Sequence, residues 1–362
     1  MDLIVESPIN SLSFGNVSYN ILRQLWRKGV NVMWFPLSGN SDFGAFDKID
    51  PEFGKWLQDS ANKANSKIDP EMPSLKLWHL NGSQSRIGAK QALYTFYELD
   101  QPTEAEINLA KFQDLVYFSS NYSANKFKEF GVNAKVLPVG FDEDLHKTGK
   151  RYLNPSVTHF GLMGKFEKRK HTEKIIKLWI SKFGNNNAYQ LSVCVTNPFF
   201  KQEEMNNMLS NCLGGKRCTN INFLPYLKTN SEVNDFLNAI DIDLTGLSGA
   251  EGWNLPAFNA TCLGKWSIVL NETAHKDWAN DTNSIIVDSN GIEPCYDGKF
   301  FHEGSAFNQG NIYTWDSDVV AQAMDDAVSK KGQNNTNGEL LKEEFSYSRS
   351  VDRLLKGIEG IA

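Results

Sequence analysis

Residues 240–270 constrain the fold of this chain more than any other stretch. Two apolar runs, residues 240–247 and 266–270, flank a loop and a helix-forming segment at residues 248–264. Pro256 suits the first turn of a helix, where its missing N–H costs nothing, and Gly264 suits the position just past the helix end. The pattern predicts a strand, a loop, a helix and a second strand, which is the repeating unit of a parallel α/β sheet.

The loop of this unit carries a charge that limits what it binds. In such a unit the helix N-terminus lies at the carboxyl edge of the sheet, where unpaired backbone N–H groups favour an anionic ligand. Glu251 lies in the same loop and repels phosphate, so we expect its partners to be hydroxyl donors such as those of a sugar. On geometry alone, a carboxylate stabilised by the helix dipole explains Glu251 equally well.

The same residues resemble a known signature. Residues 248–256 read Ser-x-x-Glu-Gly-Trp-x-Leu-Pro, which is similar to the C-terminal-domain signature of retaining glycosyltransferases of the glycogen-synthase and sucrose-synthase kind, family 4-like, with the GT-B fold. The resemblance implies an α/β protein with two Rossmann-like doubly wound domains that face each other across a cleft. It makes Glu251 catalytic, and it places the nucleotide-sugar donor against Gly252, Trp253, Asn254 and Leu255. Asn259 stands where the family has a second Glu, which usually holds the ribose hydroxyls.

Two successive β/α series predict two domains. We expect an N-terminal acceptor-binding domain at residues 1–150, a linker near residues 146–154 and a nucleotide-sugar-binding domain at residues 155–340. By resemblance, a helical region at residues 341–362 crosses back onto the first domain. Gly15, at the entrance of the first helix, would let a donor approach the backbone beside Asn16. Residues 288–315 form an aromatic, glycine-containing excursion, which is longer than an ordinary loop and indicates a functional insert.

A basic loop follows the first expected strand of the second domain. Lys165 and Lys170 align with the Arg…Lys pair of the family, with Lys in place of Arg and His171 in place of Gly. The resemblance makes both catalytic, because fixed cations stabilise the departing nucleoside diphosphate. Lys keeps the charge of Arg but loses its bidentate fork. Gly164 and Arg169 are further donor-binding candidates, Lys168 is a nearby alternate, and a solvated basic loop is the plainer interpretation.

Other candidates lie at strand ends on both sides of the expected cleft. His79 and Glu98 end strands of the first domain, and the Phe-Tyr-Glu-Leu-Asp passage resembles a subset of the family that carries Glu at this position. Both are acceptor-side candidates that would orient hydroxyls, and Glu98 is also a catalytic candidate; satisfied polar groups at strand ends are the alternative. In the second domain, Tyr226 or the backbone of Leu227 would contact the nucleobase, although an aromatic residue there suits a core equally well.

Composition and one acidic motif narrow the chemistry further. Asp241 and Asp243 form a D-x-D pattern, which we interpret as strand-edge residues and not as a metal site, so we expect a metal-independent enzyme without a cofactor. The formal net charge of −6 argues against a general electrostatic grip on nucleic acid. Five cysteines form no C-x-x-C pair, which indicates reduced thiols and a cytoplasmic protein. No run approaches the roughly 20 apolar residues of a membrane span.

The functional hypothesis is therefore a retaining hexosyl- or pentosyltransferase. It would move a sugar from a UDP- or GDP-sugar, which is a co-substrate, to an acceptor hydroxyl on a glycan or another small or polymeric molecule. The abundance of Asn and Lys over Arg indicates an AT-rich and even viral source, which motivates one alternative: a phage-type DNA glycosyltransferase that acts on 5-hydroxymethylated bases in the host cytoplasm. Asn259, which stands where the family has Glu, motivates the second alternative: a non-catalytic nucleotide-sugar-binding module.

Overall fold

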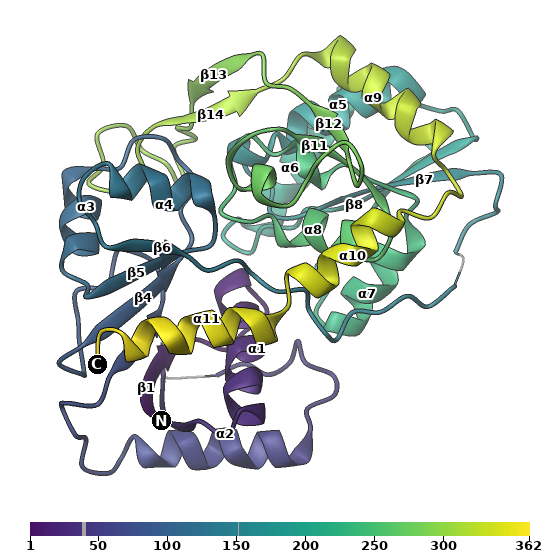
Figure 1. Cartoon of the computed structure of the whole chain (residues 1–362). Coiled ribbons are helices and arrows are strands. Elements are labelled where there is room, and N and C mark those ends of the chain that lie inside the picture. The colour runs from purple at the N-terminus through teal and green to yellow at the C-terminus, as the bar shows by residue number, and fades with distance from the viewer. Residues whose placement is uncertain (38–40, 151) are drawn as a thin grey trace.

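The computed structural model describes residues 1–37, 41–150 and 152–362, which form two parallel sheets of six strands each (Figure 1). The first sheet has the order β2-β1-β3-β4-β5-β6. Its strands are β1 (Asp2–Ser7), β2 (Asn31–Pro36), β3 (Ser74–Leu77), β4 (Gln91–Thr95), β5 (Leu115–Phe118) and β6 (Ala134–Val136). The helices of this half are α1 (Ser13–Arg27), α2 (Pro51–Lys63), α3 (Glu104–Lys111) and α4 (Asn121–Lys128).

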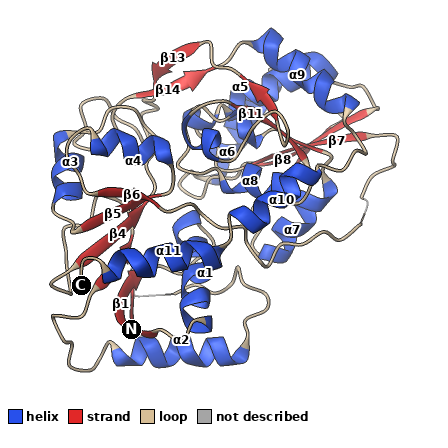
Figure 2. Cartoon of the chain, viewed as in Figure 1, coloured by secondary structure: helices blue, strands red, loops and turns tan. Residues whose placement is uncertain are grey.

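The second sheet has the order β12-β11-β10-β7-β8-β9. Its strands are β7 (Thr158–Met163), β8 (Tyr189–Cys194), β9 (Ile221–Phe223), β10 (Ile242–Asp243), β11 (Trp266–Leu270) and β12 (Ile285–Val287). The helices are α5 (Thr172–Phe183), α6 (Gln202–Leu213), α7 (Asn230–Ala239), α8 (Leu255–Cys262) and α9 (Ser317–Ser329). Both sheets have helices packed around them (Figure 2), which confirms the predicted pair of Rossmann-like doubly wound domains. The exact boundaries at 150 and 155 stay a prediction.

The unit at residues 240–270 forms as Pro256 and Gly264 predict, with one difference. Pro256 lies in the first turn of α8, and Gly264 follows the helix at φ +82°, a left-handed conformation that glycine adopts without strain. The apolar run at residues 240–247, however, gives only the short strand β10, followed by a 3-10 turn, η2 (Thr245–Leu247). The turn begins because the Asp243 carboxyl accepts a hydrogen bond from the Thr245 N–H at 3.2 Å.

The C-terminal region is two helices and not one continuous helix. They are α10 (Thr336–Glu344) and α11 (Tyr347–Glu359), and the break between them is Ser346, whose side chain caps α11 through the Arg349 N–H. Figure 1 shows α11 lying against α1 of the first domain. The Tyr117 hydroxyl donates to the Arg353 carbonyl at 3.1 Å and the Ser350 hydroxyl to the Pro138 carbonyl at 2.7 Å. These contacts tie the chain end to the first sheet.

The predicted insert at residues 288–315 contains an antiparallel hairpin, β13 (Gly291–Pro294) and β14 (Asn311–Thr314). It leaves the second domain and reaches α3 and α4 of the first (Figure 1). Asp100 accepts hydrogen bonds from the backbone N–H and the side-chain amide of Asn311, at 2.7 and 3.0 Å, and Glu106 accepts one from the Asn308 N–H at 2.8 Å. The insert is therefore a second bridge between the two domains.

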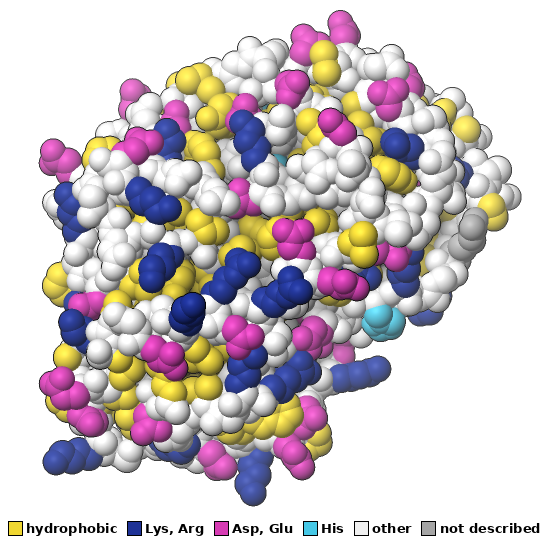
Figure 3. All heavy atoms as spheres, viewed as in Figure 1, with side chains coloured by type: hydrophobic (Ala, Val, Ile, Leu, Met, Phe, Trp, Pro, Cys, Tyr) yellow, Lys and Arg dark blue, Asp and Glu magenta, His cyan; other side chains and the backbone are white. Residues whose placement is uncertain are grey.

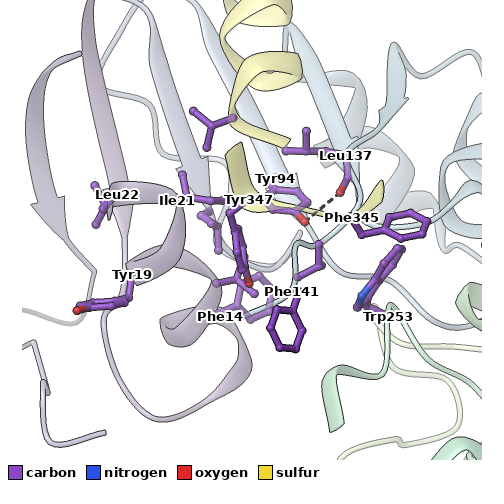
Figure 4. Close-up of a cluster of buried hydrophobic side chains, with 14 of the residues drawn as sticks. Phe14, Tyr19, Ile21, Leu22, Tyr94, Leu137, Phe141, Trp253, Phe345 and Tyr347 are labelled. Atoms are coloured by element: carbon purple, nitrogen blue, oxygen red, sulfur yellow. Dashed lines mark hydrogen bonds between the residues drawn. The ribbon is translucent and has the colours of Figure 1, made fainter. Parts of the chain in front are cut away.

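A hydrophobic cluster joins the domains beneath these surface contacts. Figure 4 shows part of it, including the Tyr94 hydroxyl, which donates to the Leu137 carbonyl at 3.0 Å. Trp253 is 3% exposed, and its ring lies 5.3 Å from Phe258 and 5.4 Å from Phe345 between centroids. The signature loop is thus anchored by an aromatic core. Among the described residues, no helix is long and apolar enough to cross a membrane.

Candidate functional site

The order of the second sheet marks the expected position of a ligand. Counted from β7 as the first strand, the order across the sheet is 3-2-1-4-5-6, so the direction of winding reverses between β7 and β10. Ligands of doubly wound sheets bind outside the carboxyl ends of the strands at this reversal. The loop after β7 carries Lys165 and Lys170, and the loop after β10 carries Glu251. The topology therefore brings the predicted catalytic residues of this domain to one place.

Glu251 lies between two basic side chains. The carboxylate is 6% exposed; Oε1 lies 2.5 Å from Lys170 Nζ, and Oε2 lies 3.2 Å from Arg169 Nη1. Its backbone N–H donates to the Thr273 hydroxyl at 3.1 Å. Burial alone would raise the pKa of Glu251, but the charges of Lys170 and Arg169 hold that pKa well below its usual range. Glu251 is therefore an ionised acceptor of hydrogen bonds at neutral pH.

The basic side chains of the loop after β7 point in different directions. The Lys165 side chain is 37% exposed; Nζ lies 3.6 Å from Glu167 Oε1 and 5.3 Å from the centre of the Phe199 ring. Lys168 Nζ donates to the Pro294 carbonyl of the insert at 2.6 Å. Arg169 is 8% exposed and turns inward. The interpretation of this loop as uniformly solvated is therefore wrong, since the structure separates its cations into an outer and an inner set.

Two backbone conformations explain the local sequence pattern. Gly164 has φ +143°, and a Cβ there would lie 3.4 Å from Lys170 Cδ, so glycine leaves room for the lysine stem. His171 has φ +53°, which is a left-handed conformation at the position where the resembling family has Gly. The His171 ring is buried, with Nδ1 3.0 Å from the Leu247 carbonyl, and burial lowers the pKa of His171 to about 4.

Glu98 of the first domain contacts Arg169 of the second. Its Oε1 lies 3.6 Å from Arg169 Nε, and its side chain is 25% exposed. Burial raises the pKa of Glu98, and Arg169 opposes that effect. His79 is exposed, with its ring 4.4 Å from Phe14 between centroids, and the pKa of His79 is lowered by the surrounding protein and by the charge of Lys165. Glu98 thus joins the Glu251 pair through Arg169, whereas His79 packs against Phe14.

Several predicted donor contacts instead have packing partners. A Cβ at Gly15 would lie 2.3 Å from the Asn10 backbone nitrogen, so this glycine allows the chain to pack on itself. The Asn16 amide donates to Asp142 at 3.1 Å. Trp253 lies in the core described above. Packing and hydrogen bonds within the protein therefore explain Gly15, Asn16 and Trp253 without a bound nucleotide sugar. Their role in donor binding stays a prediction.

The remaining predicted donor residues lie between the domains. Gly252 packs on Phe96, and its carbonyl accepts a hydrogen bond from the Ser119 hydroxyl at 2.6 Å. The Tyr226 hydroxyl donates to the Ser11 hydroxyl at 2.7 Å, so Tyr226 bridges the two domains and is only half-buried. Leu227 and Leu255 pack against the interdomain hydrophobic cluster. All four contribute to the interface between the two domains, and their role in donor binding stays a prediction.

Asn254 caps the start of α8, and Asn259 lies in the middle of the same helix. Asn254 has φ +68°, and its side chain caps the helix through the Ala257 N–H while its amide also donates to His275 Nε2 at 2.9 Å. Asn259 is 8% exposed, and its Oδ1 has no hydrogen-bond partner among the described residues. This oxygen is itself buried, and a buried polar atom without a partner is uncommon in folded proteins.

Sequence reasoning missed Glu167 and His275. Glu167 is 7% exposed and accepts a hydrogen bond from Arg169 Nη2 at 3.2 Å; a single acid among the four cations of its loop was the available signal. His275 lies 2.9 Å from the Leu270 carbonyl through Nδ1, so Nδ1 carries the proton and Nε2 accepts from Asn254. Burial lowers the pKa of His275 to about 4, in keeping with a neutral ring.

The D-x-D aspartates lie apart from the Glu251 pair. Asp241 accepts a hydrogen bond from the His159 N–H at 2.9 Å just before β10, which is the amino edge of the sheet. Asp243 is fully buried, and burial raises the pKa of Asp243 to about 6. Within residues 1–37, 41–150 and 152–362, no group of three or more His, Cys, Asp or Glu side chains is arranged to hold a metal ion.

Comparison with known proteins identifies the architecture. No family model and no curated sequence matches the chain. Solved structures match it over nearly its whole length at low identity, which shows the fold alone. Sucrose-phosphate synthase from Thermosynechococcus elongatus has a TM-score of 0.71 at 10% identity and covers 99% of this chain and 98% of its own. These relatives define the GT-B fold, so that prediction is confirmed.

Two further structures were solved with ligands. An α,α-trehalose-phosphate synthase (UDP-forming) from Burkholderia xenovorans, in complex with glucose-6-phosphate, has a TM-score of 0.67 at 10% identity and covers 99% of both chains. Anabaena HepE, in complex with UDP-glucose, has a TM-score of 0.64 at 13% identity and covers 99% of this chain and 100% of its own.

Proposed function

We propose that this chain is a glycosyltransferase that uses a nucleotide sugar as donor and acts with retention of configuration. The observation that carries the proposal is the ionised Glu251 beside Lys170, at the point where the winding of the second sheet reverses. A site for a nucleotide sugar needs both fixed cations for the diphosphate and an acceptor of hydrogen bonds for the sugar. Lys170 supplies a cation and Glu251 supplies an acceptor, and the two side chains are in direct contact.

The donor would be held by residues on both loops of the second domain. Lys170 donates one hydrogen bond to Glu251, and its ammonium has three donors in all, so it also serves the diphosphate. Lys165, at the rim, adds a second cation. Glu251 accepts from sugar hydroxyls, and the free Oδ1 of Asn259 accepts from a ribose hydroxyl. In this arrangement Asn259 replaces the family Glu by supplying one acceptor without a charge.

The transfer step is a substitution at the anomeric carbon. The bond between this carbon and the diphosphate oxygen breaks, the bond to the acceptor oxygen forms on the same face, and the acceptor proton passes to the departing phosphate. Lys165 and Lys170 stabilise the charge that grows on the phosphate. Glu98 orients the acceptor hydroxyl from the first domain. No resident metal ion is assigned a part in this step.

UDP-glucose is the first donor to examine, because HepE was solved with UDP-glucose and the trehalose-phosphate synthase is described as UDP-forming. Glucose-6-phosphate, present in the latter structure, makes sugars and sugar phosphates the first acceptors. A modified-DNA acceptor finds no support among these structures. Figure 3 shows Lys and Arg side chains gathered across the middle of the drawn face with Asp and Glu side chains around them. The formal net charge of −6 counts against a general electrostatic grip on nucleic acid.

Isothermal titration of UDP-glucose and a GDP-sugar tests the donor site. Lys165→Met is expected to weaken donor binding at least tenfold, because Lys165 loses its charge at the diphosphate while its side chain is exposed enough to be replaced without unfolding. Lys150→Met, at a side chain 62% exposed in the linker region, is the matched control and should bind as the wild type does.

Two results would contradict the proposal. One is the absence of binding by any nucleotide sugar, and the other is equal affinity in the Lys165→Met variant and the control. Binding without any release of the free nucleotide above the Glu251→Gln background would instead establish the non-catalytic binding module.

A further inference from the structure

Arg169 differs from the other cations of its loop because its side chain lies inside the protein. Nη1 lies 3.2 Å from Glu251 Oε2 and also donates to the Ala250 carbonyl. Nη2 donates to Glu167 Oε2 at 3.2 Å, and Nε lies 3.6 Å from Glu98 Oε1. One guanidinium therefore contacts three carboxylates, which come from three separate segments of the chain.

The backbone of Arg169 holds the same loop as its side chain does. The Arg169 carbonyl accepts a hydrogen bond from the Gly249 N–H at 2.9 Å, while the guanidinium holds the Ala250 carbonyl on the other side. Residues 249–251 are thus held at both ends by one residue. The planar fork of arginine makes these contacts in several fixed directions at once, and the single ammonium of a lysine does not.

The contact with Glu98 crosses from the second domain to the first. The insert fixes both sides of this contact, since Lys168, next to Arg169, donates to the Pro294 carbonyl, and Asp100, two residues after Glu98, accepts from Asn311. Glu251 on the donor side and Glu98 on the acceptor side therefore both contact Arg169. The position of Arg169 is fixed by contacts from both domains.

We propose that Arg169 is a positioning residue, which orients Glu251 toward the sugar and draws Glu98 to the same point, and that it does not bind the donor phosphates. The expected effect of Arg169 on the reaction rests on the proposed function. It replaces the prediction that Arg169 is a donor contact, because its guanidinium is already committed to carboxylates.

The decisive comparison is between Arg169→Lys, Arg169→Gln and the control Lys150→Met, with UDP-glucose as the probe. For both Arg169 variants we expect the dissociation constant of UDP-glucose to stay within threefold of the wild type, while the rate of UDP release at saturating donor falls at least tenfold. Lys150→Met should leave both the dissociation constant and the rate unchanged. Donor affinity that falls as far as in Lys165→Met, with an unchanged saturated rate, would overturn the proposal.

A second readout is independent of catalysis. The charged groups that act on Glu98 are Arg169, Lys170, Glu167 and Glu251, so loss of the guanidinium charge leaves two like charges and the single cation of Lys170. The pKa of Glu98, followed by NMR of carbon-13-labelled glutamate, should therefore rise in Arg169→Gln and rise less in Arg169→Lys. An unchanged pKa in both would refute the contact. A raised pKa without any UDP-glucose binding by the wild type would keep the network and reject the proposed function.

Discussion

Replacing Glu251 with Gln should destabilise the second domain by about 3 kcal/mol. Gln has nearly the same shape, so the change removes a charge and little packing. It leaves Lys170 and Arg169 facing a neutral group, with their side chains 15% and 10% exposed. Breaking one side of a buried pair costs about 3–5 kcal/mol. We take the lower end, because Arg169 keeps Glu98 and Glu167 as partners.

The assay is urea unfolding followed by tryptophan fluorescence at pH 7.5, with a double-mutant cycle as control. Lys170→Met alone should cost less than Glu251→Gln, since Glu251 keeps Arg169. The double variant removes both partners of the closest contact, so its cost should fall short of the sum of the two by about 1–3 kcal/mol. If Glu251→Gln unfolds within about 0.5 kcal/mol of the wild type, or if the two costs simply add, the buried pair does not exist as described.

Three further predictions concern other parts of the structure. The pKa of Asp243 is about 6 when folded against 3.8 for the free side chain, so the free energy of unfolding of the wild type should fall by about 2 kcal/mol between pH 4 and pH 7. The free energy of unfolding of Asp243→Asn should fall less over that range, and a constant difference in urea midpoint would contradict this. Gly15→Ala should cost about 1–3 kcal/mol in unfolding, because its Cβ would overlap the Asn10 backbone, while UDP-glucose affinity is unchanged; weakened binding at unchanged stability would instead support the donor-contact prediction. Asp100→Ala should speed amide hydrogen exchange across residues 291–314, since it removes both hydrogen bonds to Asn311, and unchanged exchange rates would show that the insert is held elsewhere.

The two-domain fold follows from local signals that a sequence displays. Strand-length apolar runs alternate with amphipathic stretches, and Pro256 and Gly264 bracket α8 because their backbone preferences are set by covalent structure. The run at residues 240–247 was less informative, since apolarity alone does not distinguish a strand from a buried turn. The turn there depends on a hydrogen bond from Thr245 to Asp243.

The candidate site could be predicted only in part from the sequence. Glu251, Lys170 and Glu98 were candidates because they follow expected strands in a pattern that resembles a known signature. The inward direction of Arg169 could not be predicted, because the sequence does not show which of the four cations in this loop has buried partners. Trp253 was expected at the donor and lies in the core, since its burial depends on Phe345, about 90 residues further along the chain. Contacts of that range leave no local pattern.

The central claim is that Glu251 and the cations beside it transfer a sugar from a nucleotide with retention. The most direct measurement is proton NMR of a reaction containing UDP-glucose and glucose-6-phosphate, which reports free UDP and the configuration of the new glycosidic bond together. We predict UDP and an α-configured product from the wild type, and neither above background from Glu251→Gln. A β-configured product, or equal UDP release by the variant, would contradict the account.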